Sequence, residues 1–162
     1  MSKLVRLGEL ANTYRVALQN PHIQQAYEGF MKYVMNLKSY AQNEYFDRYS
    51  FGNVSPGYMD YTYFPFFNEF LRTKKLRFGI VLNHKALRFE LWLMGQNAEI
   101  QKKYWEILKT TPWNKGVEMM PKYSVLEAIL VESPDFNDLN TLTKEIISKA
   151  ITTAEEVSRY LR

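Results

Sequence analysis

Four side chains able to do chemistry fall on one face of two adjacent predicted strands, residues 75–83 and 87–94. They are Arg77, Arg88, Glu90 and Trp92. Because successive side chains of a strand point to opposite faces, these four gather away from the apolar residues between them. Two cations, a carboxylate and an indole suit a groove for a polar or anionic ligand. The same set also suits an internal ion-pair cluster whose stems pack beneath a helix.

A tight turn around His84 joins the two strands and pairs Gly79 with Glu90. We expect Glu90 to contact Arg77, Arg88 or another cation, directly or through water, because an unpaired buried charge costs several kcal/mol. The preceding strand, residues 58–66, supplies a further carboxylate, that of Asp60. If residues 124–131 form a strand, Glu127 joins the face that carries Arg88, Glu90 and Trp92. The candidate binding residues are Asp60, Arg77, Arg88, Glu90, Trp92 and Glu127.

Much familiar chemistry is excluded by what the chain lacks. Its 162 residues include no cysteine and only two histidines, His22 and His84, so thiol chemistry is absent and a histidine-rich metal site is disfavoured. No Gly-rich phosphate loop, dinucleotide Gly triplet, H-E-x-x-H or nucleophile elbow occurs. We therefore expect no catalytic residue, no metal and no cofactor, and we expect both histidines at the surface.

The net charge is +4, and residues 56–95 carry six basic against three acidic side chains. This surplus is compatible with weak nucleic-acid contact through the basic region 72–88, but it does not require it. The aromatic strand 58–66 has rings that, if exposed, could stack on bases, although cross-strand packing explains most of them more simply. The sequence shows neither a signal peptide nor a membrane span, so we expect a cytoplasmic protein, and a homodimer is compatible with the sequence.

The elements that must position these residues follow from hydrophobic periodicity. Residues 124–131 are ambiguous: Ser124 and Glu127 match a helix capping box, while the short apolar run indicates a strand, which we prefer. The sequence predicts one globular α/β (α+β) domain over 1–162, in the order α-α-β-β-β-α-β-α. Its four-stranded sheet is mixed or mainly antiparallel, with helices covering most of both faces. The predicted helices span 3–19, 22–46, 97–110 and roughly 138–161, one helical turn lies within 67–73, and the first strand spans 58–66.

The order of elements from residue 22 to residue 131 resembles the core of the PD-(D/E)XK nucleases. That resemblance implies a restriction-endonuclease-like fold, with strand carboxylates holding a divalent metal and a lysine beside the attacking water. Glu90 falls at the family's acidic position, but Trp92 stands in place of the lysine, and strand 75–83 carries no acid. One carboxylate without a lysine is a poor metal site, so an active nuclease is the least favoured function.

Segments 57–64, 88–97, 101–105 and 133–139 resemble a family of small uncharacterised bacterial proteins of unknown function, over nearly the whole chain. Residues 89–105 also resemble part of a domain of unknown function found in restriction-associated bacterial proteins. Neither resemblance implies a functional residue. We favour a non-catalytic binding or interaction module on a nuclease-like scaffold. The alternative is a small-molecule-binding protein or enzyme that uses the face of Arg77, Arg88, Glu90 and Trp92.

Overall fold

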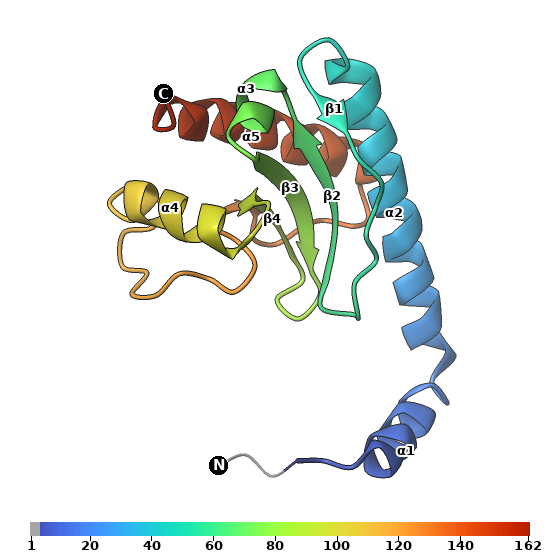
Figure 1. Cartoon of the computed structure of the whole chain (residues 1–162). Helices are drawn as coiled ribbons and strands as arrows, with labels where there is room; N and C mark the ends of the chain where they lie inside the picture. The colour runs from blue at the N-terminus through green and yellow to red at the C-terminus, as the bar shows by residue number, and fades with distance from the viewer. Residues whose placement is uncertain (1–3) are drawn as a thin grey trace. The chain divides into compact units, whose positions relative to one another are not determined.

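The computed structural model describes residues 4–162 (Figure 1). Contacts divide the chain into two compact units, Met1–Tyr33 and Val34–Arg162, and one helix runs through the boundary. One domain over 1–162 stays a prediction. The elements are α1 (Leu7–Ala17), α2 (Pro21–Tyr45), β1 (Ser50–Phe51), β2 (Tyr61–Phe67), α3 (Glu69–Thr73), β3 (Leu76–Asn83), β4 (Arg88–Gly95), α4 (Ala98–Leu108), β5 (Leu126–Val131) and α5 (Leu139–Arg159).

The first unit holds α1 and the beginning of α2. The predicted helix over 3–19 is shorter in the structure, where α1 spans Leu7–Ala17. Residue 3, where the prediction began, lies outside the described residues. No residue of α1 is buried, so its apolar positions are exposed in this chain.

The second unit is built on a sheet of five strands in sequence order, β1-β2-β3-β4-β5, and every neighbouring pair is antiparallel. The mixed α/β class and the mainly antiparallel pairing are confirmed. The predicted count of four strands is wrong, since the structure adds β1 as a fifth. Strand β1 was missed because it has only two residues and lies among turn-forming residues. Such a short edge strand gives no alternating pattern to recognise.

One face of the sheet is apolar apart from the buried Thr62 of β2, in line with strand alternation. Helix α5 contacts β4 and β5 and lies behind the sheet in Figure 1. Its buried stripe includes Leu142, Ile146, Ala150, Ala154 and Val157. The fully buried strand residues on the apolar face include Phe64, Phe66, Phe78, Ile80, Leu82, Phe89, Leu91 and Leu93.

The register of β3 against β4 differs from the prediction by two residues. Gly79 pairs with Trp92, and Glu90 pairs with Val81 rather than with Gly79. The turn between the strands occupies residues 84–87, whereas the predicted pairing of Gly79 with Glu90 centres it on residues 83–86. A shift of two residues leaves every side chain on its predicted face, so the division into faces holds.

The ambiguous segment is a strand, β5, as preferred from its length. The capping-box pair still forms a contact, since Ser124 Oγ donates to Glu127 Oε1 at 2.8 Å, but no helix begins there. True N-caps occur at Asn97 and Asp138, whose side chains accept from the backbone N–H three residues later.

The nuclease-like fold is not confirmed. None of the helices described over residues 4–162 is long and apolar enough to cross a membrane.

Candidate functional site

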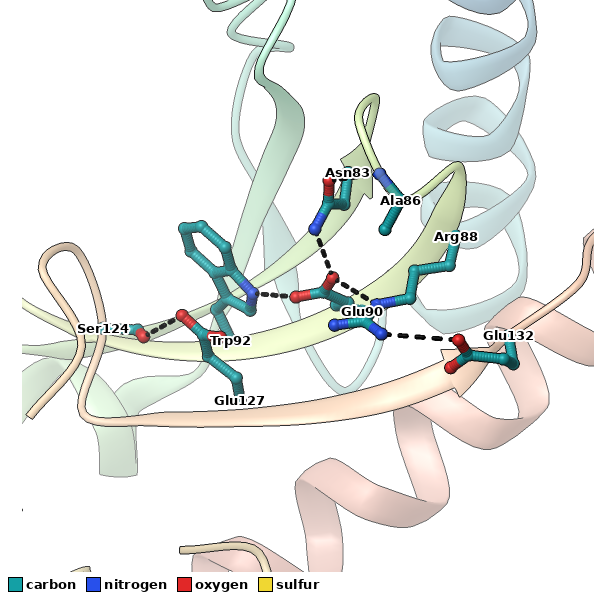
Figure 2. A network of polar contacts seen from close by, with 8 residues as sticks. All are labelled: Asn83, Ala86, Arg88, Glu90, Trp92, Ser124, Glu127 and Glu132. Atoms are coloured by element: carbon teal, nitrogen blue, oxygen red, sulfur yellow. Dashed lines mark hydrogen bonds and ion pairs between the residues drawn. The ribbon is translucent and has the colours of Figure 1, made fainter. Parts of the chain in front are cut away.

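Glu90 lies at the centre of a closed polar network on the second face of the sheet (Figure 2). Its side chain is only 2% exposed. Oε2 accepts from Arg88 Nε at 2.8 Å and from Asn83 Nδ2 at 2.9 Å. Oε1 accepts from Trp92 Nε1 at 2.8 Å. The three donors come from β3 and β4, and antiparallel pairing places Asn83 directly opposite Arg88.

This network confirms that Glu90 pairs with a cation, and that cation is Arg88. The Arg88 guanidinium also reaches the exposed Glu132, with Nη1 at 3.4 Å from Oε1. The hydrogen bond to Glu90 raises the pKa of Arg88 further above its ordinary value. Because three donors occupy the buried carboxylate, Glu90 is poorly disposed to ligate a metal. The geometry therefore gives no support to a nuclease role for Glu90.

A partly open pocket of about 320 Å³ lies beside the network on the same face. Residues of strands and loops line the pocket, and no helical residue does. The prediction that helices cover most of both faces is therefore wrong for this part of the sheet. We call it the aromatic pocket, after its tyrosine and tryptophan rings. Its lining residues are Ser55, Gly57, Tyr58, Asp60, Tyr61, Tyr63, Arg77, Trp92, Met94, Gly95 and Tyr123.

Three of these rings form a connected wall. The centroids of Tyr61 and Trp92 lie 4.7 Å apart, and those of Tyr61 and Tyr123 lie 6.4 Å apart. Gly79, which pairs with Trp92 across β3 and β4, has no side chain. A Cβ there would lie 2.7 Å from Met94 Cε and 3.4 Å from Tyr63 Cδ2, so these side chains fill the space that the glycine leaves.

The loop at residues 55–60 forms one rim of the aromatic pocket and is tightly built. Gly57 has φ +71°, and a Cβ there would lie 2.2 Å from the backbone oxygen of Tyr61. Asp60 Oδ1 accepts from the backbone N–H of Tyr58 at 2.8 Å and of Tyr61 at 2.7 Å. These two hydrogen bonds lower the pKa of Asp60. The loop thus requires glycine at position 57 and an acceptor at position 60.

His84 ties this rim to the β3–β4 turn. The hydroxyl of Thr62 donates to the carbonyl of Pro56 at 2.7 Å and lies 2.7 Å from His84 Nε2. Because the only hydroxyl proton goes to Pro56, His84 Nε2 carries a proton and donates to Thr62. Burial lowers the pKa of His84, and nearby Asp60 partly opposes that shift. His84 is therefore half-buried and has a structural contact that the sequence did not predict.

Arg77 is the only cation lining the aromatic pocket. Its side chain is exposed and forms no hydrogen bond or ion pair with any of residues 4–162. Burial and the nearby carboxylates of Glu127, Glu90 and Asp60 raise the pKa of Tyr61. The pocket therefore combines aromatic rings, among them the protonated phenol of Tyr61, with one guanidinium that is available to an anion.

Glu127 lies on β5 opposite Trp92 and is half-buried. Burial raises the pKa of its carboxyl. The Ser124 hydroxyl and the charge of Arg88 oppose the shift, whereas the charge of Glu90 adds to it. Glu127 does not line the aromatic pocket. Over the part of the chain that the structure describes, no group of three or more His, Cys, Asp or Glu side chains could hold a metal ion.

The six candidate residues thus separate into two groups. Asp60, Arg77 and Trp92 line the aromatic pocket, while Arg88, Glu90 and Glu127 do not. Sequence reasoning missed Tyr61 and Tyr63, because their strand was interpreted mainly as packing. It also missed Tyr123 in the irregular segment before β5, where no periodicity indicates which side chain points inward. The additional lining residues are Ser55, Gly57, Tyr58, Tyr61, Tyr63, Met94, Gly95 and Tyr123.

These features define a mixed α/β protein built on an open antiparallel sheet, with a pocket on one face. Residues 7–161 match the family described as "Domain of unknown function (DUF7000)", and the chain belongs to that family. The expectation of an uncharacterised family is confirmed, whereas likeness to the nucleases is not shown. Neither the curated proteins nor the solved structures include a match.

Proposed function

We propose that this protein is a non-catalytic binding module that takes a small aromatic anion in the aromatic pocket. One observation carries the proposal: aromatic rings surround a hollow into which Arg77 brings a guanidinium without a partner among residues 4–162. An exposed cation against apolar walls favours an anionic group, and the rings favour a flat ligand. The volume of about 320 Å³ falls at the small end of the range for ligand sites.

The chemistry of the lining residues supports binding rather than catalysis. A general base needs a pKa near the working pH. Asp60 is the only carboxylate in the lining, and two backbone N–H groups lower its pKa. Tyr61 is a poor nucleophile because its pKa is raised and its phenol stays protonated. The buried Glu90 acts through Trp92, which it holds against the pocket, and is a positioning residue.

The test is a titration with benzoate, followed by amide and indole N–H resonances. We expect saturable shifts at Arg77, Trp92 and Tyr123, with a dissociation constant of about 1 mM, which suits so small a ligand. Neutral benzyl alcohol should bind about tenfold more weakly, because it lacks the charge that Arg77 meets.

Arg77→Gln should weaken benzoate by about the same factor. The matched control is Lys85→Gln, an exposed cation in the β3–β4 turn that does not line the pocket. Benzoate that fails to shift these resonances up to about 20 mM would contradict the proposal. Equal binding of benzoate and benzyl alcohol would remove the role of Arg77.

A further inference from the structure

A second hollow adjoins the aromatic pocket and shares Arg77 with it. Its volume is about 310 Å³. We call it the basic hollow, because three of its six lining residues are cationic and none is acidic. Its lining residues are Phe67, Arg72, Lys75, Leu76, Arg77 and Gln96.

The three cations of the basic hollow lack counter-charges. Arg72, Lys75 and Arg77 are exposed, and none of their side chains forms a hydrogen bond or ion pair with residues 4–162. Elsewhere in this chain, cations such as Lys109 and Lys149 pair with a neighbouring glutamate. Like charges gathered around one hollow repel each other, and a bound polyanion relieves that repulsion.

Hydrogen bonds, one local and one between distant residues, fix the backbone that carries Arg72 and Lys75. Asn68 caps the N-terminus of α3, where its Oδ1 accepts from Leu71 N at 3.0 Å, and Arg72 lies in the last turn of this helix. Lys75 follows with φ +59°, a conformation uncommon for a side chain of its size. Its carbonyl accepts from Gln96 N at 3.0 Å, so the end of β4 holds it in place. The backbone that positions Arg72 and Lys75 is therefore fixed before a ligand binds.

We propose that the two hollows together bind one nucleoside 5′-phosphate, with its base in the aromatic pocket and its phosphate in the basic hollow. This inference rests on the proposed function and extends it. Flat bases stack on tyrosine and tryptophan rings, and arginine and lysine bind phosphate. Two adjoining hollows joined at Arg77 suit a ligand whose ring and phosphate are separated by a spacer, as ribose separates them.

Asp60 favours a nucleotide over other phosphorylated aromatic molecules. Asp60 lines the aromatic pocket and does not line the basic hollow. A carboxylate only accepts hydrogen bonds, so it matches a ligand whose ring or sugar carries donors. Exocyclic amines and ribose hydroxyls supply such donors, whereas the ring of a phenyl phosphate has none.

The experiment is calorimetric titration of the full chain with AMP, GMP, CMP and UMP, each compared with its nucleoside. We expect at least one monophosphate to bind about tenfold or more tightly than its nucleoside, because the basic hollow meets the phosphate. The double variant Arg72→Gln/Lys75→Gln should reduce that advantage clearly, although Arg77 remains in the basic hollow, and should leave nucleoside binding unchanged. The control is Lys144→Gln, an exposed lysine on α5 that lines neither hollow.

Circular dichroism checks that the double variant folds. We expect it to fold, because both replaced side chains, Arg72 and Lys75, are exposed. The proposal is overturned if no monophosphate binds below about 5 mM, or if the double variant binds monophosphates as the wild type does. Benzoate binding without any phosphate advantage overturns the nucleotide inference and leaves the proposed function standing. If a twelve-nucleotide dT strand binds and no monophosphate does, the nucleotide inference is overturned and the ligand is a nucleic acid.

Discussion

The indole Nε1–H of Trp92 donates to Oε1 of Glu90, two residues earlier on the same strand, at 2.8 Å. Side chains two residues apart on a strand share a face, so this contact is local in sequence. It joins two regions of different character, since Glu90 is buried in a polar network while Trp92 lines the aromatic pocket. The network thereby fixes one wall of the candidate site.

Removing Glu90 should destabilise the fold strongly. Glu90→Ala leaves the buried indole N–H and the Asn83 amide without their acceptor and leaves Arg88 without its closest counter-charge. We expect the free energy of unfolding to fall by about 3 kcal/mol in urea melts. Exposed Glu132 contacts the same guanidinium, so Glu132→Ala is the matched control and should cost about 0.5 kcal/mol or less. Equal losses for the two variants would refute a structural role specific to Glu90.

Gly57 should be far less replaceable than Gly116, although both have positive φ. A Cβ at Gly57 meets a backbone oxygen, whereas a Cβ at Gly116 meets nothing within 4 Å. Gly116→Ala should cost only the conformational strain, about 1 kcal/mol, and Gly57→Ala about 1–2 kcal/mol more. Urea melts measure both, and benzoate binding should be lost only in the Gly57 variant. Indistinguishable melts would show that the loop at 55–60 yields easily.

Glu127 should make stability fall as the pH rises above the acid range. Its folded pKa is raised by burial, so the unfolded carboxyl loses its proton first, at about 4.3. Between the unfolded and folded pKa values the folded state holds more protons, and stability therefore decreases with pH. Glu127→Gln should remove this decrease and raise stability at pH 7 by roughly 0.5 kcal/mol.

The measurement for Glu127 is a pair of urea melts at pH 4 and pH 7. Gln can still accept from the Ser124 hydroxyl, so the contact seen at 2.8 Å survives in the variant. The exposed Glu118→Gln serves as the control. A Glu127→Gln protein less stable than wild type at pH 7 would mean that the ionised carboxylate is needed.

His84 should contribute stability that is lost in acid. Burial lowers its folded pKa, so the unfolded ring gains a proton first as the pH falls below about 6.5. The unfolded state then binds more protons, and the free energy of unfolding decreases toward pH 5. In His84→Ala this decrease between pH 7 and pH 5 should be smaller, by about 0.5 kcal/mol or more.

The control for His84 is His22→Ala, since His22 is exposed and lies in the other compact unit. Thermal or urea melts at pH 7, 6 and 5 compare the three proteins. If His22→Ala flattens the pH profile as much as His84→Ala does, the contact with Thr62 is not the cause.

Local patterns determined most of the fold. Period-two alternation in β3 and β4 assigned each side chain to its face, and that assignment survived a two-residue error in register. It also brought Arg88, Glu90 and Trp92 together, because residues two apart on a strand must share a face. The long periodic run of α5 made its type recognisable, whereas β5 had to be assigned from the short length of its apolar run. The two-residue β1 gave no such run.

Only the tertiary structure decided which candidates form a pocket. Glu90 and Trp92 lie two residues apart in sequence. Hydrogen-bond donors enclose the Glu90 carboxylate, whereas Trp92 lines the aromatic pocket. That difference depends on loops 55–60 and 117–125, whose conformations follow from glycine geometry and long-range contacts rather than from periodicity. Tyr123, in the irregular segment before β5, reaches Tyr61 of β2 across 62 positions of the chain. The sequence by itself thus determined the chemistry available on that face, and side-chain packing decided which groups a ligand can reach.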